Sequence, residues 1–317
     1  MKRLFAILLF LAFIPFINSC GEIPNVDIYA SIYPIEFLVK EIVGDKYVVK
    51  SVYPRGKDVH DYEVSPKEFK SLSNSKMIFY IGLGLETVIE NCKDKELSAV
   101  PTIALTHNLT LIELNSDNVH EGHNHIGEGT GFYDPHVWLD PINMKIMADT
   151  ILEEIINHMD LTSSEIDVLT ENCDDLKLEL QKLDSEFDEV LADENIANKT
   201  IMVDHDAYAY WQLRYGIQRI RMRNQNDSPD VSPSEMKEKI NQAKAMGIKY
   251  ICTTKNELES SIIASYLSEL DLSSDAKRQL HHLGTITASE DKTEDYFSLM
   301  RYNLSVLEEI LPKKSLD

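Results

Sequence analysis

Three of the ten histidines lie in or near loops that follow predicted strands, where side chains commonly bind ligands. His60 follows the strand-like run at 47–53, and His205 comes directly after the run at 200–203. His136 lies between these two along the chain. Ligands of open α/β sheets bind at the carboxyl ends of strands, and imidazole is the commonest metal ligand in proteins. The three positions together indicate a metal cleft, although each histidine alone is more often a surface or hydrogen-bonded residue.

The segments around these histidines alternate between strand-like and helix-like patterns. Ser65-Pro66-Lys67-Glu68 and Ser232-Pro233-Ser234-Glu235 each combine a capping box with a proline at the first helical position, so each predicts a helix start. Alternation of this type is typical of βα units and mainly parallel sheets. Apolar, β-rich runs predict strands within 26–33, 47–53, 77–81 and 100–105, and again within 200–203, 217–222 and 248–253.

A long helix is predicted between the two alternating halves. The stretch from Thr162 to Asp193 has no glycine or proline, and its apolar residues recur at steps of three and four. Such a helix would extend roughly 45 Å. Its seam would pack along its own protein, although a coiled-coil dimer is an alternative. We therefore expect a monomer with an α/β fold: two lobes linked by one rigid helix, with the metal site in the cleft between them. The predicted boundaries are 20–160, 161–193 and 194–317.

The first nineteen residues predict an export signal. Lys2 and Arg3 precede an apolar run that is shorter than the roughly 20 residues of a spanning helix. Ser19-Cys20-Gly21 resembles a bacterial lipobox, in which Cys20 carries the lipid, although an ordinary signal peptide is the alternative. We expect an exported protein that is anchored to the cell envelope by lipid alone.

Charge and cysteine content narrow the function further. Loss of the signal would remove two of the 31 basic residues and none of the 53 acids, so the net charge would move from −22 to −24. This balance disfavours nucleic acid as a partner. Cys92, Cys173 and Cys252 are widely spaced and predict small buried side chains, since they form no metal motif or disulfide framework.

Three segments resemble the metal-binding subunits of the zinc and manganese ABC importers, the cluster A-I solute-binding proteins. The first is Val59-His60-Asp61-Tyr62-Glu63, and the second is Asp134-Pro135-His136-Val137-Trp138-Leu139-Asp140-Pro141. The third is the stretch Val203-Asp204-His205-Asp206-Ala207-Tyr208-Ala209-Tyr210, followed by Tyr215-Gly216-Ile217. The resemblance spans the whole mature chain. It implies that His60, His136 and His205 bind Zn²⁺ as transported cargo and that no catalysis occurs. It also implies delivery to a membrane permease with its cytoplasmic ATPase.

The third ligand position bears on which metal is bound. Manganese-selective members of the family carry a carboxylate there, whereas this chain has His205. A site rich in nitrogen suits zinc, while manganese prefers oxygen and stands lowest in the divalent affinity series. The fourth ligand stays open. The family often supplies a late aspartate, which aligns with Thr287; Glu290, Asp291 or water would have to take its place.

The remaining histidines give weaker evidence for metal binding. His120, His123 and His125 lie in a glycine-rich loop that either binds metal weakly or is simply solvated. His281 and His282 are expected at the surface.

Two other functions fit parts of the sequence. Three histidines and a water could form a zinc hydrolase, but there is no HExxH helix and no obvious general base. A surface adhesin is the second alternative, since the lipid anchor would permit it. The chain also lacks a phosphate-binding Gly-Lys-Ser/Thr loop, so it should not hydrolyse ATP itself.

Overall fold

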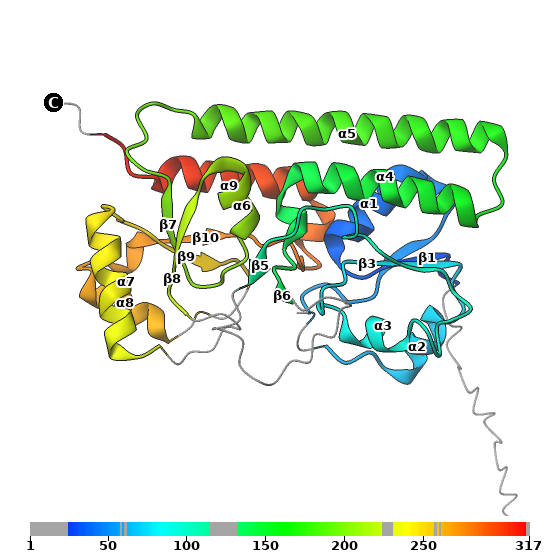
Figure 1. The fold of residues 1–317 in the computed structure, drawn as a ribbon, viewed down its shortest axis with the longest axis horizontal. Coiled ribbons are helices and arrows are strands. Elements are labelled where there is room, and N and C mark those ends of the chain that lie inside the picture. Colours follow the sequence, from blue (N-terminus) through cyan, green and yellow to red (C-terminus); the bar gives the residue numbers. More distant parts are fainter. Residues whose placement is uncertain are drawn as a thin grey trace, which may run out of the picture.

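The structure is a computed structural model that describes residues 25–57, 59, 62–114, 132–223, 231–256, 259 and 261–314. The predicted signal peptide, Cys20 and the histidines at 120, 123 and 125 lie outside these ranges. Two four-stranded parallel sheets stand side by side, and a long helix runs along both of them (Figure 1). This arrangement confirms the expected α/β fold with two lobes.

The N-terminal sheet has the strand order β2-β1-β3-β4. Its central strands are buried throughout, which explains why they read as unbroken apolar runs. Each strand lies inside a run predicted from the sequence. The strands are β1 (Ile28–Ala30), β2 (Val49–Ser51), β3 (Met77–Tyr80) and β4 (Thr102–Ala104).

The C-terminal sheet has the order β10-β9-β7-β8, and all its pairings are parallel. The strand β10 was not predicted. It lies at the edge of the sheet and reads Lys-Arg-Gln-Leu, so it lacks the apolar run that marks a central strand. The strands are β7 (Thr200–Val203), β8 (Gln218–Arg221), β9 (Ile251–Thr254) and β10 (Lys277–Leu280).

The outer helices start where the sequence predicted them. Ser65 and Ser232 each cap a helix through the backbone N–H of a glutamate three residues later, and that glutamate binds back to the cap. A short antiparallel pair, β5 (Glu113–Leu114) and β6 (Phe132–Tyr133), lies between the lobes (Figure 1). The shorter helices are α2 (Pro66–Leu72), α3 (Thr87–Cys92), α6 (Ala209–Tyr215), α7 (Pro233–Ala245) and α8 (Ile262–Glu269).

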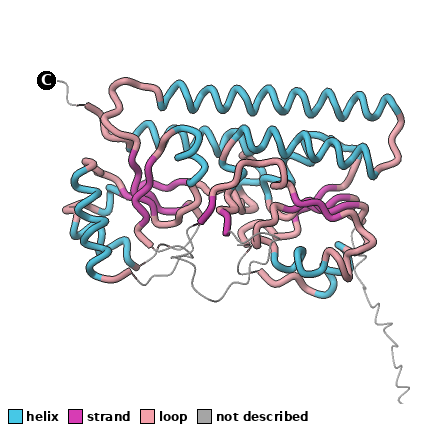
Figure 2. The backbone as a smooth tube through the Cα atoms, viewed as in Figure 1, coloured by secondary structure: helices cyan, strands magenta, loops and turns pink. Residues whose placement is uncertain are grey.

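The long helix α5 (Ser163–Leu191) begins at the predicted capping box of Thr162. It packs against α1 (Tyr33–Val43), α4 (Pro141–His158) and α9 (Tyr296–Ile310), which form a layer between it and the sheets (Figure 2). Its apolar seam is buried within this single chain, so the seam is occupied without a coiled-coil partner. Because α1 and α4 lie over one sheet and α9 over the other, α5 joins the two lobes rigidly.

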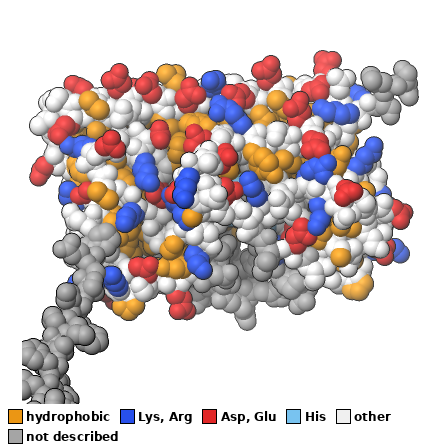
Figure 3. All heavy atoms as spheres, turned by 180° about the vertical axis from the view of Figure 1, so that it is seen from behind, with side chains coloured by type: hydrophobic (Ala, Val, Ile, Leu, Met, Phe, Trp, Pro, Cys, Tyr) orange, Lys and Arg blue, Asp and Glu red, His pale blue; other side chains and the backbone are white. Residues whose placement is uncertain are grey.

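The surface matches the acidic composition. Figure 3 shows acidic and basic side chains interspersed over one face, with acidic side chains along the edge formed by α5. Within the described ranges, no helix is both long and apolar enough to cross a membrane. Cys173 and Cys252 are buried and Cys92 is half-buried, and all three are free thiols. Their expected role as small packing residues therefore holds best for the first two.

Candidate metal site

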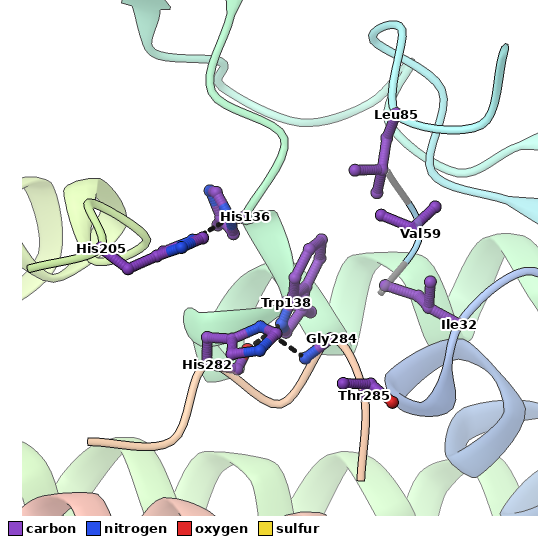
Figure 4. A pocket seen from close by; sticks show the side chains of 9 residues that line it. All are labelled: Ile32, Val59, Leu85, His136, Trp138, His205, His282, Gly284 and Thr285. Atoms are coloured by element: carbon purple, nitrogen blue, oxygen red, sulfur yellow. Dashed lines mark hydrogen bonds between the residues drawn. The ribbon is translucent and has the colours of Figure 1, made fainter. Parts of the chain in front are cut away.

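Two of the three predicted histidines meet at the junction of the lobes. The Nε2 atoms of His136 and His205 lie 3.4 Å apart, and their rings are nearly perpendicular, at 85° (Figure 4). Zn–N bonds of about 2.0–2.1 Å at tetrahedral angles place neighbouring nitrogens about 3.3–3.4 Å apart. The two imidazoles are therefore already spaced as a pair of ligands on one tetrahedral ion.

The ring of His136 is oriented by the residue two positions before it. Its Nδ1 lies 2.8 Å from Oδ1 of Asp134, and its backbone N–H donates to the same oxygen at 2.9 Å. A buried carboxylate beside Nδ1 keeps the ring proton on that nitrogen and leaves the Nε2 lone pair available for a metal. Carboxylates that hydrogen-bond the nitrogen that does not bind the metal fix the orientation of ligand histidines in metal sites.

Buried aromatic side chains hold the backbone around His136. The hydroxyl of Tyr210 donates to the Asp134 carbonyl at 2.9 Å, and the indole of Trp211 donates to the Leu139 carbonyl at 2.8 Å. Both donors come from α6, the helix that directly follows the His205 loop. A third donor from α9, the Tyr296 hydroxyl, binds the Trp138 carbonyl at 2.8 Å. These hydrogen bonds tie the backbone of the His136 segment to α6 and α9 of the C-terminal lobe.

His205 lies two residues beyond the end of β7, as the sequence predicted. The strand extends into this loop, because the Asp204 N–H donates to the Cys252 carbonyl on β9 at 2.9 Å. On the other side, Asp206 pairs with Arg219 of β8 at 2.7 Å. Burial raises the pKa of Asp206, and the guanidinium of Arg219 opposes that rise. The loop carrying His205 is thus anchored to both neighbouring strands.

The N-terminal lobe contributes an apolar wall to the same pocket, made of Ile32, Val59 and Leu85 (Figure 4). Leu85 is held by its neighbour Glu86, a fully buried carboxyl that accepts the N–H groups of Ile81 and Gly82 at 2.9 Å each. Burial raises the pKa of Glu86 to about 7.

The third predicted ligand, His60, lies outside the described residues. Val59 directly precedes it and lines the pocket. Across the part of the chain that the structure describes, no three His, Cys, Asp or Glu side chains gather closely enough to hold a metal. The pocket contains about 20 Å³ of free space, which suits an ion or a water better than an organic molecule.

The prediction that His281 and His282 lie at the surface is wrong. His281 is fully buried and His282 is 5 % exposed, and His282 lines the pocket beside His136 and His205. The pair comes directly after β10. His282 lies two residues beyond the end of β10, just as His205 lies two residues beyond the end of β7. The sequence does not predict the polar edge strand β10, so it does not place the pair at the carboxyl end of a strand. A prediction of β10 would have been the signal that places these histidines near the site.

The late acids considered as a fourth ligand have other partners. The Glu290 carboxylate binds Lys255 at 3.1 Å, Asn256 at 2.8 Å and both the N–H and hydroxyl of Thr287 at 2.9 Å. Burial would raise the pKa of Glu290, but these contacts lower it to about 2. Asp291 binds Arg55 of the other lobe at 2.7 Å. Neither acid lines the pocket.

The chain has two α/β lobes with parallel sheets, a long helix that bridges them and paired histidines at their junction. This combination is typical of solute-binding proteins for metal ions. The family model described as "Zinc-uptake complex component A periplasmic" (ZnuA) matches residues 28–310. The chain belongs to this family.

Different relatives are named for different metals. The zinc-binding protein AdcA of Streptococcus pyogenes is 27 % identical over 92 % of this chain, which spans only 58 % of AdcA's length. The manganese ABC transporter substrate-binding lipoprotein PsaA of Streptococcus anginosus is 28 % identical over 87 % of this chain and 86 % of its own. The zinc-bound ZnuA-like domain of Streptococcus pneumoniae AdcA shares the fold, with a TM-score of 0.72 and 23 % identity. That match covers 91 % of this chain and 99 % of the domain.

Proposed function

We propose that this chain is the extracytoplasmic subunit of an ABC metal importer, and that it captures Zn²⁺ and passes it to a membrane permease with a cytoplasmic ATPase. His60, His136 and His205 bind the ion as cargo. The observation that carries the proposal is the 3.4 Å separation of the His136 and His205 Nε2 atoms. That spacing matches one edge of a zinc tetrahedron.

The choice of zinc over manganese depends on the donor atoms. Relatives named for either metal are similar to this chain in sequence, so the family alone does not decide which metal is bound. Both described candidate ligands are imidazoles, and the sequence supplies a third in His60. The nearby carboxylates Asp134 and Glu290 have other partners. Manganese would lack the oxygen ligands that it prefers.

The test is elemental analysis of the anaerobically purified chain, followed by competitive titration with zinc and manganese. We expect one tightly bound zinc per chain and weak manganese binding. Alanine at position 60, 136 or 205 should reduce zinc affinity by at least 100-fold. His158→Ala is the matched control, because His158 is exposed at the far end of α4 and should bind zinc like wild type. Tight manganese binding that survives His205→Ala would contradict the proposal.

We further propose that Cys20 carries a lipid that anchors the protein, as a monomer, to the cell envelope. The name of the PsaA relative includes the word lipoprotein, and Ser19-Cys20-Gly21 fits a lipobox. Cys20→Ala should release the protein from membranes while its zinc affinity stays unchanged. A variant that still fractionates with membranes after a high-salt wash would rule out lipid anchoring at this residue.

A further inference from the structure

His282 is a pocket residue with no role in the three-histidine site. Its ring is buried and lines the same cavity as His136 and His205 (Figure 4). It stacks on His205 with ring centroids 5.5 Å apart and an angle of 24° between the planes. A ligand imidazole holds its metal in the ring plane, beyond the nitrogen. The centroid separation is close to the 5.4 Å between His136 and His205, so it is the protonation of the His282 nitrogens that separates a ligand role from a neighbouring one.

The backbone fixes which nitrogen of His282 carries the proton. The N–H of Gly284 donates to Nδ1 of His282 at 3.2 Å, so Nδ1 acts as an acceptor. In a neutral imidazole the proton then lies on Nε2, which becomes a donor. A nitrogen that carries a proton has no lone pair for a metal. In this tautomer His282 offers the pocket an N–H group and no ligand atom.

The loop that presents His282 is tightly constrained. The indole of Trp138 donates to the His282 carbonyl at 2.7 Å, which ties the loop to the His136 segment. Leu283 adopts a left-handed φ of 61°, which costs conformational energy in a residue with a bulky side chain. At Gly284 a Cβ atom would approach Nδ1 of His282 to 3.0 Å and the Trp138 ring to 3.3 Å. The surroundings therefore hold the His282 ring in one place and one orientation.

A zinc ion bound by three imidazoles needs a fourth ligand. Neither Glu290 nor Asp291 lines the pocket, and both are engaged elsewhere. The Thr285 hydroxyl does line it, but accepts the N–H of Gly56 at 3.1 Å. Among the described residues, no acid is then available for the fourth position. We assign that position to a water or a small anion, whose oxygen would be stabilised by a neighbouring N–H donor.

We propose that His282 is a positioning residue for the bound metal: its Nε2–H donates a hydrogen bond to the non-protein fourth ligand of the ion. This inference rests on the proposed zinc site. It places a hydrogen bond from His282 on the oxygen, of a water or a small anion, that completes the coordination of the ion.

The test compares two variants of His282 that differ in the proposed donor. Both His282→Phe and His282→Gln remove the acceptor for the Gly284 N–H, so that loss is matched. Phenylalanine keeps a ring that can stack on His205 but has no N–H. Glutamine loses the ring but carries an amide N–H close to the position of Nε2. Zinc affinity is measured by chelator competition, and the ligands are counted by X-ray absorption at the zinc edge. Thermal unfolding of the metal-free variants verifies that both are folded.

We expect His282→Phe to bind zinc about tenfold more weakly than wild type, in the range seen when a hydrogen-bond partner of a metal ligand is removed. His282→Gln should bind within about threefold of wild type. The absorption spectra should report three imidazoles and one oxygen in all three proteins.

Three results would overturn the inference. Wild-type affinity in His282→Phe would mean that the donor is irrelevant. Equal weakening in both variants would mean that His282 acts through packing alone. Four imidazoles in wild type that fall to three in His282→Phe would make His282 a direct ligand. Failure of the zinc site itself would look different, because wild type would then bind no zinc or the alanine variants of His136 and His205 would bind it normally.

Discussion

Arg55 and Asp291 form an ion pair between the two lobes, with 2.7 Å from Nη2 to Oδ1. The second terminal nitrogen of the guanidinium, Nη1, binds the buried carboxylate of Glu36 at 2.7 Å. Beside this pair, the N–H of Gly56 donates to the Ile286 carbonyl at 2.8 Å. These contacts tie the loop that leads to His60 to the loop that follows His282. The pair thus forms an inter-lobe clasp next to the pocket.

Breaking the clasp should loosen the contact between the lobes more than it weakens the fold. The Asp291 side chain is 40 % exposed, so solvent screens the pair and its coupling energy should be about 0.5–1 kcal/mol. A double-mutant cycle of Arg55→Gln and Asp291→Asn, followed by urea unfolding, measures it. Zinc should dissociate several-fold faster from each single variant, as measured by stopped-flow chelation. Unchanged dissociation rates would show that the lobes are held together without this pair.

Replacing Glu290 should affect stability and leave metal binding nearly intact. Its carboxylate accepts from Lys255, Asn256 and Thr287 and is only 11 % exposed. Glu290→Gln should therefore lower the free energy of unfolding by about 1.5–3 kcal/mol, as expected when charged hydrogen bonds are lost. Zinc affinity should stay within about threefold of wild type. A 100-fold loss of affinity with little loss of stability would instead make Glu290 a metal ligand.

His281 should make the metal-free protein less stable in acid. Burial is the main reason that the pKa of His281 falls to about 4, below its usual value of 6.5. The unfolded chain therefore binds more protons between these values, and stability is lost as the pH falls from about 6.5 towards 4. Between pH 7 and pH 5 the contribution is about 2 kcal/mol.

The measurement is urea unfolding of wild type and His281→Asn at both pH values. The drop in unfolding free energy on acidification should be about 2 kcal/mol smaller in the variant. Glu86 contributes a pH dependence of stability with the opposite sign, because burial raises its pKa to about 7. Comparing two proteins that both contain Glu86 removes its contribution. An equal drop in both proteins would mean that His281 accepts a proton freely in the folded state.

The hydroxyl of Tyr210 should support both the fold and the site, because it binds the carbonyl of Asp134, which orients His136. Tyr210→Phe leaves a buried carbonyl with one donor fewer. It should cost about 1–2 kcal/mol of stability and several-fold in zinc affinity. Tyr302→Phe is the matched control, since it removes an exposed hydroxyl–carbonyl bond to Gln279 and should change stability by under about 0.5 kcal/mol. Equal effects in the two variants would argue against a link between Tyr210 and the site.

Local sequence determined much of this protein. The capping boxes at Ser65, Thr162 and Ser232 start helices because their hydrogen bonds join residues three apart, so no distant partner is required. The spacing of apolar residues likewise predicted α5 and the central strands. The motif residues around His136 and His205 pointed to a shared site, and the fold brings their Nε2 atoms to 3.4 Å.

Only the tertiary structure decided what the late loop does. In sequence, Glu290 and Asp291 are better candidate ligands than His282, because acids bind metals and paired histidines often lie at surfaces. In the fold, Lys255 and Arg55 come from distant elements to engage the two acids. A left-handed turn at Leu283 and a hydrogen bond from Trp138 bring His282 into the pocket instead. These contacts join residues 35 to 236 positions apart, or depend on a backbone conformation that residue type does not predict, so sequence pattern could not reveal them.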